Sequence, residues 1–264
     1  MKRGECGLCQ KEKYLALSHL MPKSLYRKIR NGYSGTDIVV SQASDKSSFY
    51  SNRQETQYFL CEDCEILFSR LGENKVVPDC HGGEKQFPLL DWVNSAVHFA
   101  QRDGSLWISP IQNKFDRTDE YLYFAASIYW RGSAWPISKC GNQGSLGAYQ
   151  EEFRKYLLGE ATFPKNAFVT VYVDTDDPIY PLMSFPTSAK KGGYHHHIFN
   201  IPGVKFSMVV GKTVKGVREV STALGSKLIF ATYSYTKHKD FKYYNRKISQ
   251  EFTSKGRLAK QKNV

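Results

Sequence analysis

The sequence predicts an α+β protein with a small, metal-stapled module in residues 1–78 and a larger α+β domain in residues 79–264. Two Cys-x-x-Cys pairs near the amino terminus predict the module. Beyond it, helix-like segments come first and strand-like segments follow, which predicts a sheet with helices on one side. A turn-rich segment with Pro78, a Gly-Gly pair and Pro88 separates the two parts.

The two cysteine pairs are Cys6 with Cys9 and Cys61 with Cys64. Cysteines at this spacing direct their sulfur atoms to one point, so two pairs supply the four corners of a tetrahedral Zn2+ site. Disulfides are the weaker interpretation because the start of the chain, MKRGECGLC, lacks the apolar segment of a secretory signal. Independent thiol-redox motifs are a further alternative. We expect one structural Zn2+ bound by all four cysteines.

The residues around the pairs predict a treble-clef arrangement. Gly7 lies inside the first pair, where the chain must bend tightly around a metal. The second pair follows a short apolar run and opens a helix-like segment. Glu62, Asp63 and Glu65 fall in its first turn, where the helix dipole favours anions. A knuckle, a hairpin and a helix that begins at the second pair are the parts of a treble clef.

The segments CGLC, ALSHLMPK and FLCEDCE resemble the HNH branch of the His-Me finger nucleases, in the form whose ββα element is stapled by a treble-clef zinc. The resemblance covers about residues 1–75. It implies a metal-dependent endonuclease that hydrolyses phosphodiester bonds in nucleic acid, with DNA favoured and RNA as the other substrate. It also implies a role in prokaryotic defence against phage.

The resemblance also implies roles for individual residues. His19 would activate a water for attack on the phosphodiester, since imidazole is the natural general base near neutral pH. A divalent ion, Mg2+ or Mn2+, would be held by Glu65 and by Glu73 as a second ligand. The asparagine that orients the base in this family has no clear match, and we expect Gln57 to take its place, with Asn52 as the alternative.

The sequence departs from the family pattern at Ser18, which stands where a metal ligand is usual. Two interpretations therefore stay open beside the nuclease. One is a hairpin histidine at position 19 that is bonded only to backbone. The other is a catalytically inactive, zinc-stabilised protein that binds nucleic acid or acts as an adaptor.

The formal net charge of +12 is concentrated at both ends of the chain. Such a distribution suits a polyanion, because each phosphate that a protein neutralises releases counterions; a solvated basic surface is the alternative. Basic residues interleave with tyrosines in both places, as in proteins that hold nucleotides by charge and stacking. The candidate nucleic-acid-binding residues are Lys23, Arg27, Lys28 and Arg30, and Lys239, Lys242, Arg246 and Lys247.

Patterns in the larger domain predict helices over 89–101, 118–129 and 147–158, and strands over 167–174, 197–202, 205–211 and 227–235. Strand alternation puts His195 and His197 on one face, where they would form a metal or phosphate site or, more ordinarily, hydrogen-bonded strand histidines. We expect a partner protein or a second copy of the chain to dock on this domain. The chain has no membrane-spanning run, and we expect a cytoplasmic protein.

Overall fold

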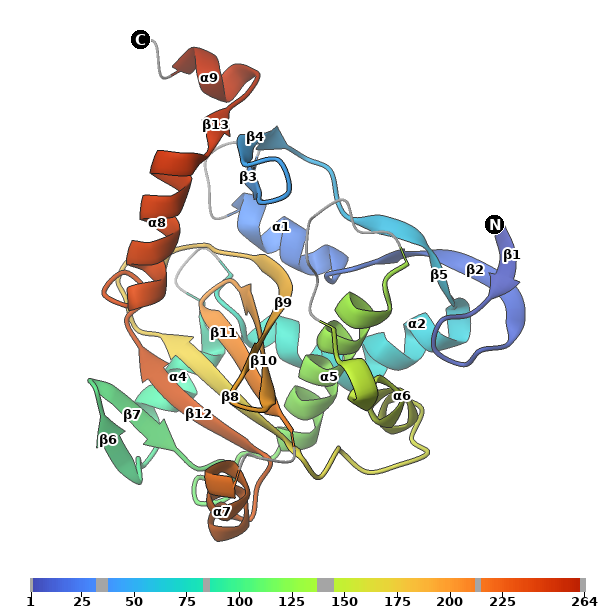
Figure 1. Ribbon diagram of the computed structural model, residues 1–264. Coiled ribbons are helices and arrows are strands. Elements are labelled where there is room, and N and C mark those ends of the chain that lie inside the picture. Colours follow the sequence, from blue (N-terminus) through green and yellow to red (C-terminus); the bar gives the residue numbers. More distant parts are fainter. Residues whose placement is uncertain (1, 32–37, 83–85, 137–144, 212–214, 262–264) are drawn as a thin grey trace.

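A computed structural model describes residues 2–31, 38–82, 86–136, 145–211 and 215–261. These residues form three sheets and several helices (Figure 1), so the predicted α+β class is confirmed. None of the described helices combines the length and the apolar character that crossing a membrane requires.

The N-terminal part is a three-stranded antiparallel sheet with a helical segment behind it. Its strands are β1 (Lys2–Glu5), β2 (Glu12–His19) and β5 (Thr56–Cys61), in the order β1-β2-β5. Helix α1 (Lys23–Asn31) follows β2. Directly after β5 comes a helical segment made of α2 (Glu62–Phe68), a π-helical turn (Ser69–Glu73), α3 (Asn74–Val76) and a 3-10 turn (Val77–Asp79).

A second small sheet joins the two ends of the chain. Strands β3 (Ile38–Gln42) and β4 (Ser47–Ser51) form a hairpin between β2 and β5. The short strand β13 (Thr253–Ser254) pairs in parallel with β4, and α9 (Arg257–Gln261) follows it. The C-terminal segment therefore returns to the N-terminal part, as Figure 1 shows.

The large sheet has seven strands in the order β6-β7-β12-β8-β11-β10-β9. Within this sheet, β12 and β8 are the only described neighbours that run parallel; the other neighbours are antiparallel. The strands are β6 (Ala100–Arg102), β7 (Ser105–Ile108), β8 (Ala167–Asp174), β9 (Ser184–Lys191), β10 (Tyr194–Ile201), β11 (Val204–Val210) and β12 (Leu228–Tyr233).

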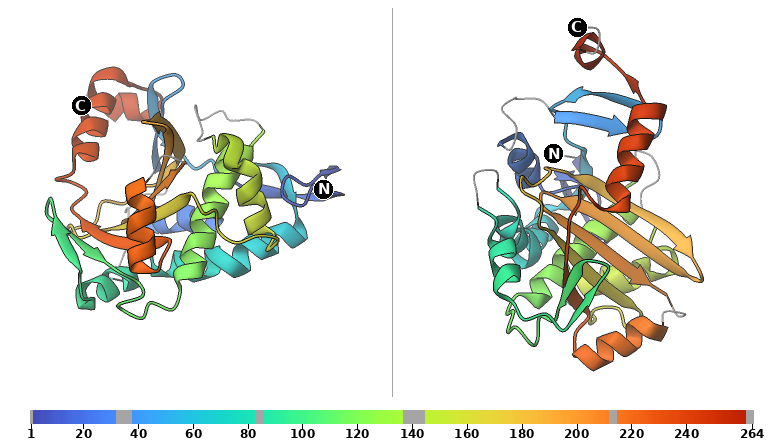
Figure 2. Two further views of the ribbon diagram at one scale, coloured as in Figure 1. Left: turned by 60° about the horizontal axis from the view of Figure 1, so that its bottom comes forward. Right: turned by 90° about the vertical axis from the view of Figure 1, so that its left-hand side faces the viewer.

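Helices α4 (Pro88–Ser95) and α5 (Thr118–Ala134) cover one face of this sheet. Trp92 of α4 and Tyr121 of α5 both contact the ring of Phe230 in β12. A 3-10 turn (Gly147–Tyr149) leads into α6 (Gln150–Leu157), which packs beside α5. Two helices lie elsewhere, α7 (Lys215–Leu224) before β12 and α8 (Lys239–Glu251) after it, and Figure 2 shows α8 standing beyond the sheet.

Most of the predicted elements correspond to observed ones. The strand predicted over 167–174 is β8, and the helix predicted over 118–129 is the first part of α5. The helix predicted over 89–101 ends earlier, at Ser95, because its last residues belong to the hairpin β6–β7. Asp103 and Gly104 form the turn with φ of 52° and 78°, an Asp-Gly sequence typical of tight hairpins.

One hydrophobic core runs through both parts of the chain. Phe68 and Val76 from the N-terminal helical segment belong to the same buried cluster as Phe124 and Phe206. The approach is close at Gly72, where a Cβ atom would lie 3.1 Å from the Cα of Phe124. A larger residue at position 72 would push the helical segment away from α5, so this contact fixes where the N-terminal site lies relative to α5.

Candidate functional site

Four cysteine side chains meet where the N-terminal knuckle faces the start of α2. The Sγ atoms of Cys6, Cys9, Cys61 and Cys64 lie within 4.8 Å of one another. The Sγ atoms of Cys9 and Cys61 are 3.9 Å apart, close to the roughly 3.8 Å between two sulfurs of a tetrahedral centre with Zn–S bonds of about 2.3 Å. The group can therefore hold a structural Zn2+, as the cysteine spacing predicts.

The knuckle is shaped by its glycine and its backbone hydrogen bonds. A Cβ atom on Gly7 would lie 2.2 Å from the ring of Phe59, so no larger residue fits there. The backbone N–H of Gly7 donates to the carbonyl of Phe59 at 2.9 Å. The N–H of Cys61 donates to the Sγ of Cys6 at 3.2 Å. These bonds hold the two halves of the metal site together across β5.

The thiols of this group share protons unequally. A hydrogen bond from Cys64 lowers the pKa of the Cys6 thiol to about 4, and the same contact raises the pKa of Cys64. Burial raises the pKa of Cys61. Adjacent thiolates repel one another, and a bound divalent cation removes that repulsion. Zinc binding here is thus expected to release protons.

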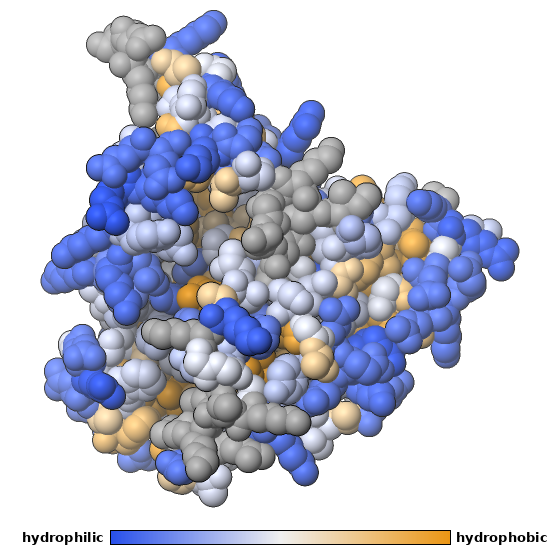
Figure 3. All heavy atoms as spheres, in the orientation of Figure 1, coloured by the Kyte–Doolittle hydropathy of each residue, from blue (hydrophilic) through white to orange (hydrophobic). Residues whose placement is uncertain are grey.

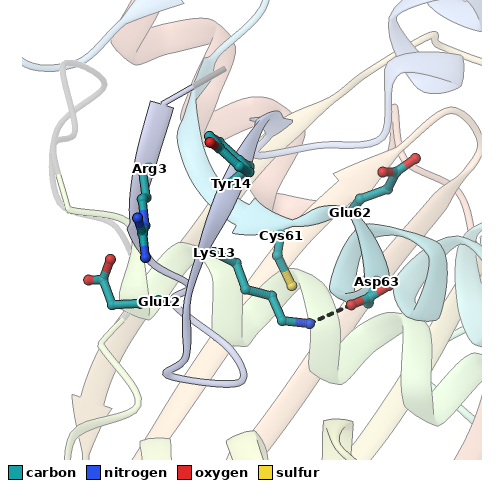
Figure 4. A pocket seen from close by; sticks show the side chains of 7 residues that line it. All are labelled: Arg3, Glu12, Lys13, Tyr14, Cys61, Glu62 and Asp63. Carbon is teal, nitrogen blue, oxygen red and sulfur yellow. Dashed lines mark hydrogen bonds and ion pairs between the residues drawn. The ribbon is translucent and has the colours of Figure 1, made fainter.

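A pocket lies beside the cysteine group, as Figure 4 shows. Side chains of both charges line it, and Lys13 Nζ donates to Asp63 Oδ2 at 2.6 Å. The balance of charge favours neither an anion nor a cation. Cys61 of the metal site lies at the wall of the pocket, and none of the lining residues belongs to the predicted catalytic set. The lining residues are Arg3, Glu12, Lys13, Tyr14, Cys61, Glu62 and Asp63.

His19 is the last residue of β2, and its imidazole is half-buried. Its Nε2 lies 2.7 Å from Oε1 of Gln54, a residue just before β5. We expected Gln57 to orient this ring. Gln57 instead pairs with Ser18 in the sheet, and facing residues of an antiparallel pair point to the same side. Gln57 therefore lies on the side opposite His19, and Gln54 takes the orienting position.

A β-bulge explains the difference. Leu15 pairs with Cys61, but Leu17 pairs with Tyr58, so the register shifts by one residue between them. Continued without the shift, the register would have placed Gln57 directly opposite His19. With it, Thr56 faces His19. Nothing in the local sequence marks this bulge, so the sequence alone does not point to Gln54.

The two sides of this hairpin differ in exposure. Leu17 and Tyr58, on the side of His19, are 53% and 45% exposed. Ser18, on the other side, is 1% exposed, and its Oγ accepts a hydrogen bond from the N–H of Leu60. Ser18, which stands where the HNH resemblance implies a metal ligand, therefore bonds to the hairpin backbone. His19 lies on the side of the hairpin that is open to solvent.

The two predicted carboxylate ligands have different surroundings. Oε1 of Glu65, on α2, is buried and has no hydrogen-bond partner among the described residues. The Glu73 carboxylate, on the π-helical turn, forms an ion pair with Nη2 of Arg131 from α5. Glu65 is therefore available to a cation, whereas Glu73 is already neutralised by a guanidinium.

Arg131 joins the parts of the site that are distant in sequence. Its side chain is 1% exposed, its Nη1 donates to the carbonyl of His19 at 2.7 Å, and its guanidinium lies 4.9 Å from the ring centre of Phe68. The end of β2 and the π-helical turn are both held by this one side chain. No sequence spacing links it to His19, because the two residues are 112 positions apart in the chain.

The basic residues predicted on α1 divide into two groups. Lys23 and Arg27 are exposed. Lys28 donates to the carbonyl of Cys80 at 2.9 Å, and Arg30 donates to that of Asn52 at 3.0 Å. Lys23 and Arg27 can therefore contact a polyanion freely, and the other two also serve the fold. The second predicted set, Lys239, Lys242, Arg246 and Lys247, lies on α8.

The two strand histidines are placed on one face as predicted, with ring centres 6.1 Å apart. His197 is fully buried, and neither of its ring nitrogens has a partner within the described chain. Burial and the neighbouring histidines lower its pKa to about 4. A cation is not held there by any third ligand among the described residues.

Comparisons of the chain with protein-family models, with curated proteins and with solved structures found no match, so the geometry described above carries the functional argument.

Proposed function

We propose that this protein is a metal-dependent endonuclease that hydrolyses phosphodiester bonds in nucleic acid, with DNA favoured over RNA. The observation that carries the proposal is His19 at the end of a zinc-type hairpin, on its solvent side, with Nε2 fixed at 2.7 Å from Gln54. A histidine held by one ring nitrogen at the open edge of such a hairpin is placed to serve as a general base.

The tautomer follows from this hydrogen bond. The amide oxygen of Gln54 only accepts, so the proton must lie on Nε2 of His19. Nδ1 then carries the lone pair, and no described residue occupies it with a hydrogen bond. A water that approaches Nδ1 can transfer a proton to it while attacking phosphorus. In this proposal Gln54, rather than Gln57, would orient the base.

Of the two carboxylates expected to bind the divalent ion, Glu65 is the one that suits this role. Glu65 offers a buried carboxylate oxygen without a partner, the kind of hard ligand that Mg2+ or Mn2+ prefers. Such an ion would stabilise charge on the scissile phosphate and on the leaving oxygen. Because Glu73 forms an ion pair with Arg131, the ion would be bound by Glu65 together with water and phosphate oxygens.

The exposed Lys23 and Arg27 lie on α1, which begins four residues after His19. Their charges would bind phosphates that flank the scissile bond. In the setting that the HNH resemblance implies, such cleavage would act against foreign DNA.

A second candidate is a zinc-stabilised protein that binds nucleic acid without cutting it. Two observations favour it: Glu73 is neutralised by Arg131, and Ser18 takes the place of a ligand and bonds to the backbone. Both candidates share the zinc group and the basic surface, so only an activity measurement separates them.

The test is a cleavage panel of plasmid, single-stranded DNA, tRNA and total RNA with Mg2+ or Mn2+. We expect the wild type to cleave at least one substrate and His19→Ala to lose that activity with unchanged zinc content. His98→Ala is the matched control, because His98 is exposed and lies between α4 and β6. Cleavage by His19→Ala at the wild-type rate, or none by the wild type on any substrate, would overturn the proposal.

A further inference from the structure

Helix α8 buries none of its residues, which is unusual for a helix of 13 residues. Asp240, Phe241 and Lys247 are half-buried, and the rest are exposed. Figures 1 and 2 show it standing apart from the large sheet, and Figure 3 shows hydrophilic side chains over it. A helix that gains so little from burial needs support at its ends or a partner along its length.

Both ends of α8 are braced. At its start, Asp240 forms an ion pair with Lys205 of β11, and the ring of Phe241 contacts Tyr235. At its end, the chain continues into β13, which pairs with β4. Supports at the two ends hold the helix in place, and along its middle Lys247 donates to the Tyr243 hydroxyl at 3.3 Å.

The basic charge of α8 is only partly neutralised by ion pairs. Its two acidic residues are both used internally, Asp240 with Lys205 and Glu251 with Lys46. Lys239, Lys242 and Arg246 are exposed and form no ion pair within the described chain. Spaced by three and four residues, these three lie along one side of the helix.

We propose that α8 is a tether for the phosphate backbone of nucleic acid, separate from the site that cleaves it. The free cations lie along one side, and Tyr243, 48% exposed, lies among them. A row of cations with an accessible ring suits phosphates and nearby bases. An anionic membrane would need a broad apolar side, whereas α8 exposes only a narrow apolar strip, formed by Tyr244 and Ile248 at 42% and 37% exposure. The choice of nucleic acid as the bound polymer rests on the proposed function. Binding to α8 does not require that the protein cleaves this polymer.

The experiment measures binding without cleavage. The full chain carrying His19→Ala is titrated with a fluorescent 30-base-pair DNA duplex without added divalent ions, from 50 to 200 mM salt. The test variant adds Lys239→Ala, Lys242→Ala and Arg246→Ala. The matched control instead adds Lys75→Ala, Lys155→Ala and Lys165→Ala, which removes the same charge from exposed positions on other elements.

Each lost phosphate contact lowers the slope of log affinity against log salt by about 0.9, so the test variant should lose about 2.7 from that slope. We expect its Kd at 100 mM salt to rise at least about tenfold, since the three contacts are lost together, with the control close to the parent. The thermal transition should stay unchanged, because the three side chains are exposed.

An unchanged slope in the test variant, or an equal loss in the control, would overturn the tether. The tether would also be overturned if the three substitutions weakened binding to phosphatidylserine vesicles but left binding to the duplex unchanged. The two proposals are tested independently. If the wild type cleaves no substrate in the panel described above, the binding measurement still tests the tether. If the α8 substitutions do not change binding, the panel still tests cleavage.

Discussion

Replacing Arg131 with methionine tests whether one buried guanidinium holds the site together. The side chain is 1% exposed and makes two hydrogen-bonded contacts, with the carbonyl of His19 at 2.7 Å and with the Glu73 carboxylate. Methionine keeps much of the length and the contact with Phe68 but removes the charge and the donors. The Glu73 carboxylate, whose side chain is 18% exposed, then loses its cation.

Breaking a buried ion pair by removing one partner costs about 3–5 kcal/mol, because an uncompensated charge stays behind. The carbonyl of His19 also loses its donor, so we expect a loss of about 4 kcal/mol in the free energy of unfolding. For a chain of this size that corresponds to a fall of about 10 °C in Tm. Adding Glu73→Gln to Arg131→Met should restore about 2 kcal/mol, because it removes the stranded charge.

Urea unfolding of the wild type, both single variants and the double variant forms the required cycle, with zinc content measured for each. Cleavage by Arg131→Met, assayed at a temperature below its unfolding transition, should be slower than cleavage by the wild type. The reason is that the carbonyl of His19, at the end of β2, loses its hydrogen bond from Arg131. A change in stability below about 0.5 kcal/mol, or a double variant no more stable than Arg131→Met, would refute the role assigned to this contact.

Three further predictions concern the zinc group, the base and the large sheet. Cys9→Ser should lower zinc content from one ion per chain to none, while Cys80→Ala, outside the group, keeps it; equal zinc in both would contradict the site. Gln54→Leu should reduce cleavage at least tenfold and Gln57→Leu much less, since only Gln54 holds the imidazole; the reverse order would contradict the observed register. The stability of the wild type relative to His197→Phe should fall by about 3 kcal/mol as pH decreases from about 6.5 to 4, because buried His197 resists protonation that the unfolded chain accepts.

The pH experiment needs the variant because a second group acts in the opposite direction. Burial raises the pKa of Asp174, which is 1% exposed, to about 6. Its contribution to stability is present below the ordinary pKa of an aspartate and is lost as pH rises toward 6. The wild-type curve contains both effects, and only its difference from the His197→Phe curve isolates the histidine. A flat difference between pH 4 and 6.5 would contradict the burial argument.

Features that depend on short-range spacing were predictable from the sequence. The cysteine group required only two local pairs, and the strand over 167–174 required only its β-branched, apolar run. The Asp103-Gly104 turn is equally local, and it directs into a hairpin the residues that periodicity assigns to a longer helix. It shows that a turn signal of two residues outweighs helical periodicity when the flanking residues can pair.

Features that depend on register or on distant partners were not predictable. One extra residue in β5, between Tyr58 and Cys61, decides whether Gln57 or Thr56 faces His19. The fate of Glu73 depends on Arg131, 58 residues later in the chain. Neither spacing nor composition encodes such a contact, since it arises only when α5 packs on the helical segment at Gly72.

The same packing leads to a prediction about the boundary at residue 78. Phe59 contacts the rings of Trp130 and Trp135 at 5.7 and 5.2 Å, and Arg131 reaches back to His19. A fragment of residues 1–78 retains all four cysteines but loses this cover and the anchor of β2. We expect it to bind one Zn2+, to expose apolar surface that binds a hydrophobic dye, and to lack the cleavage activity of the full chain. If the fragment cleaved as well as the full chain, the site would be complete without α5, and the role argued here for Arg131 would fail with it.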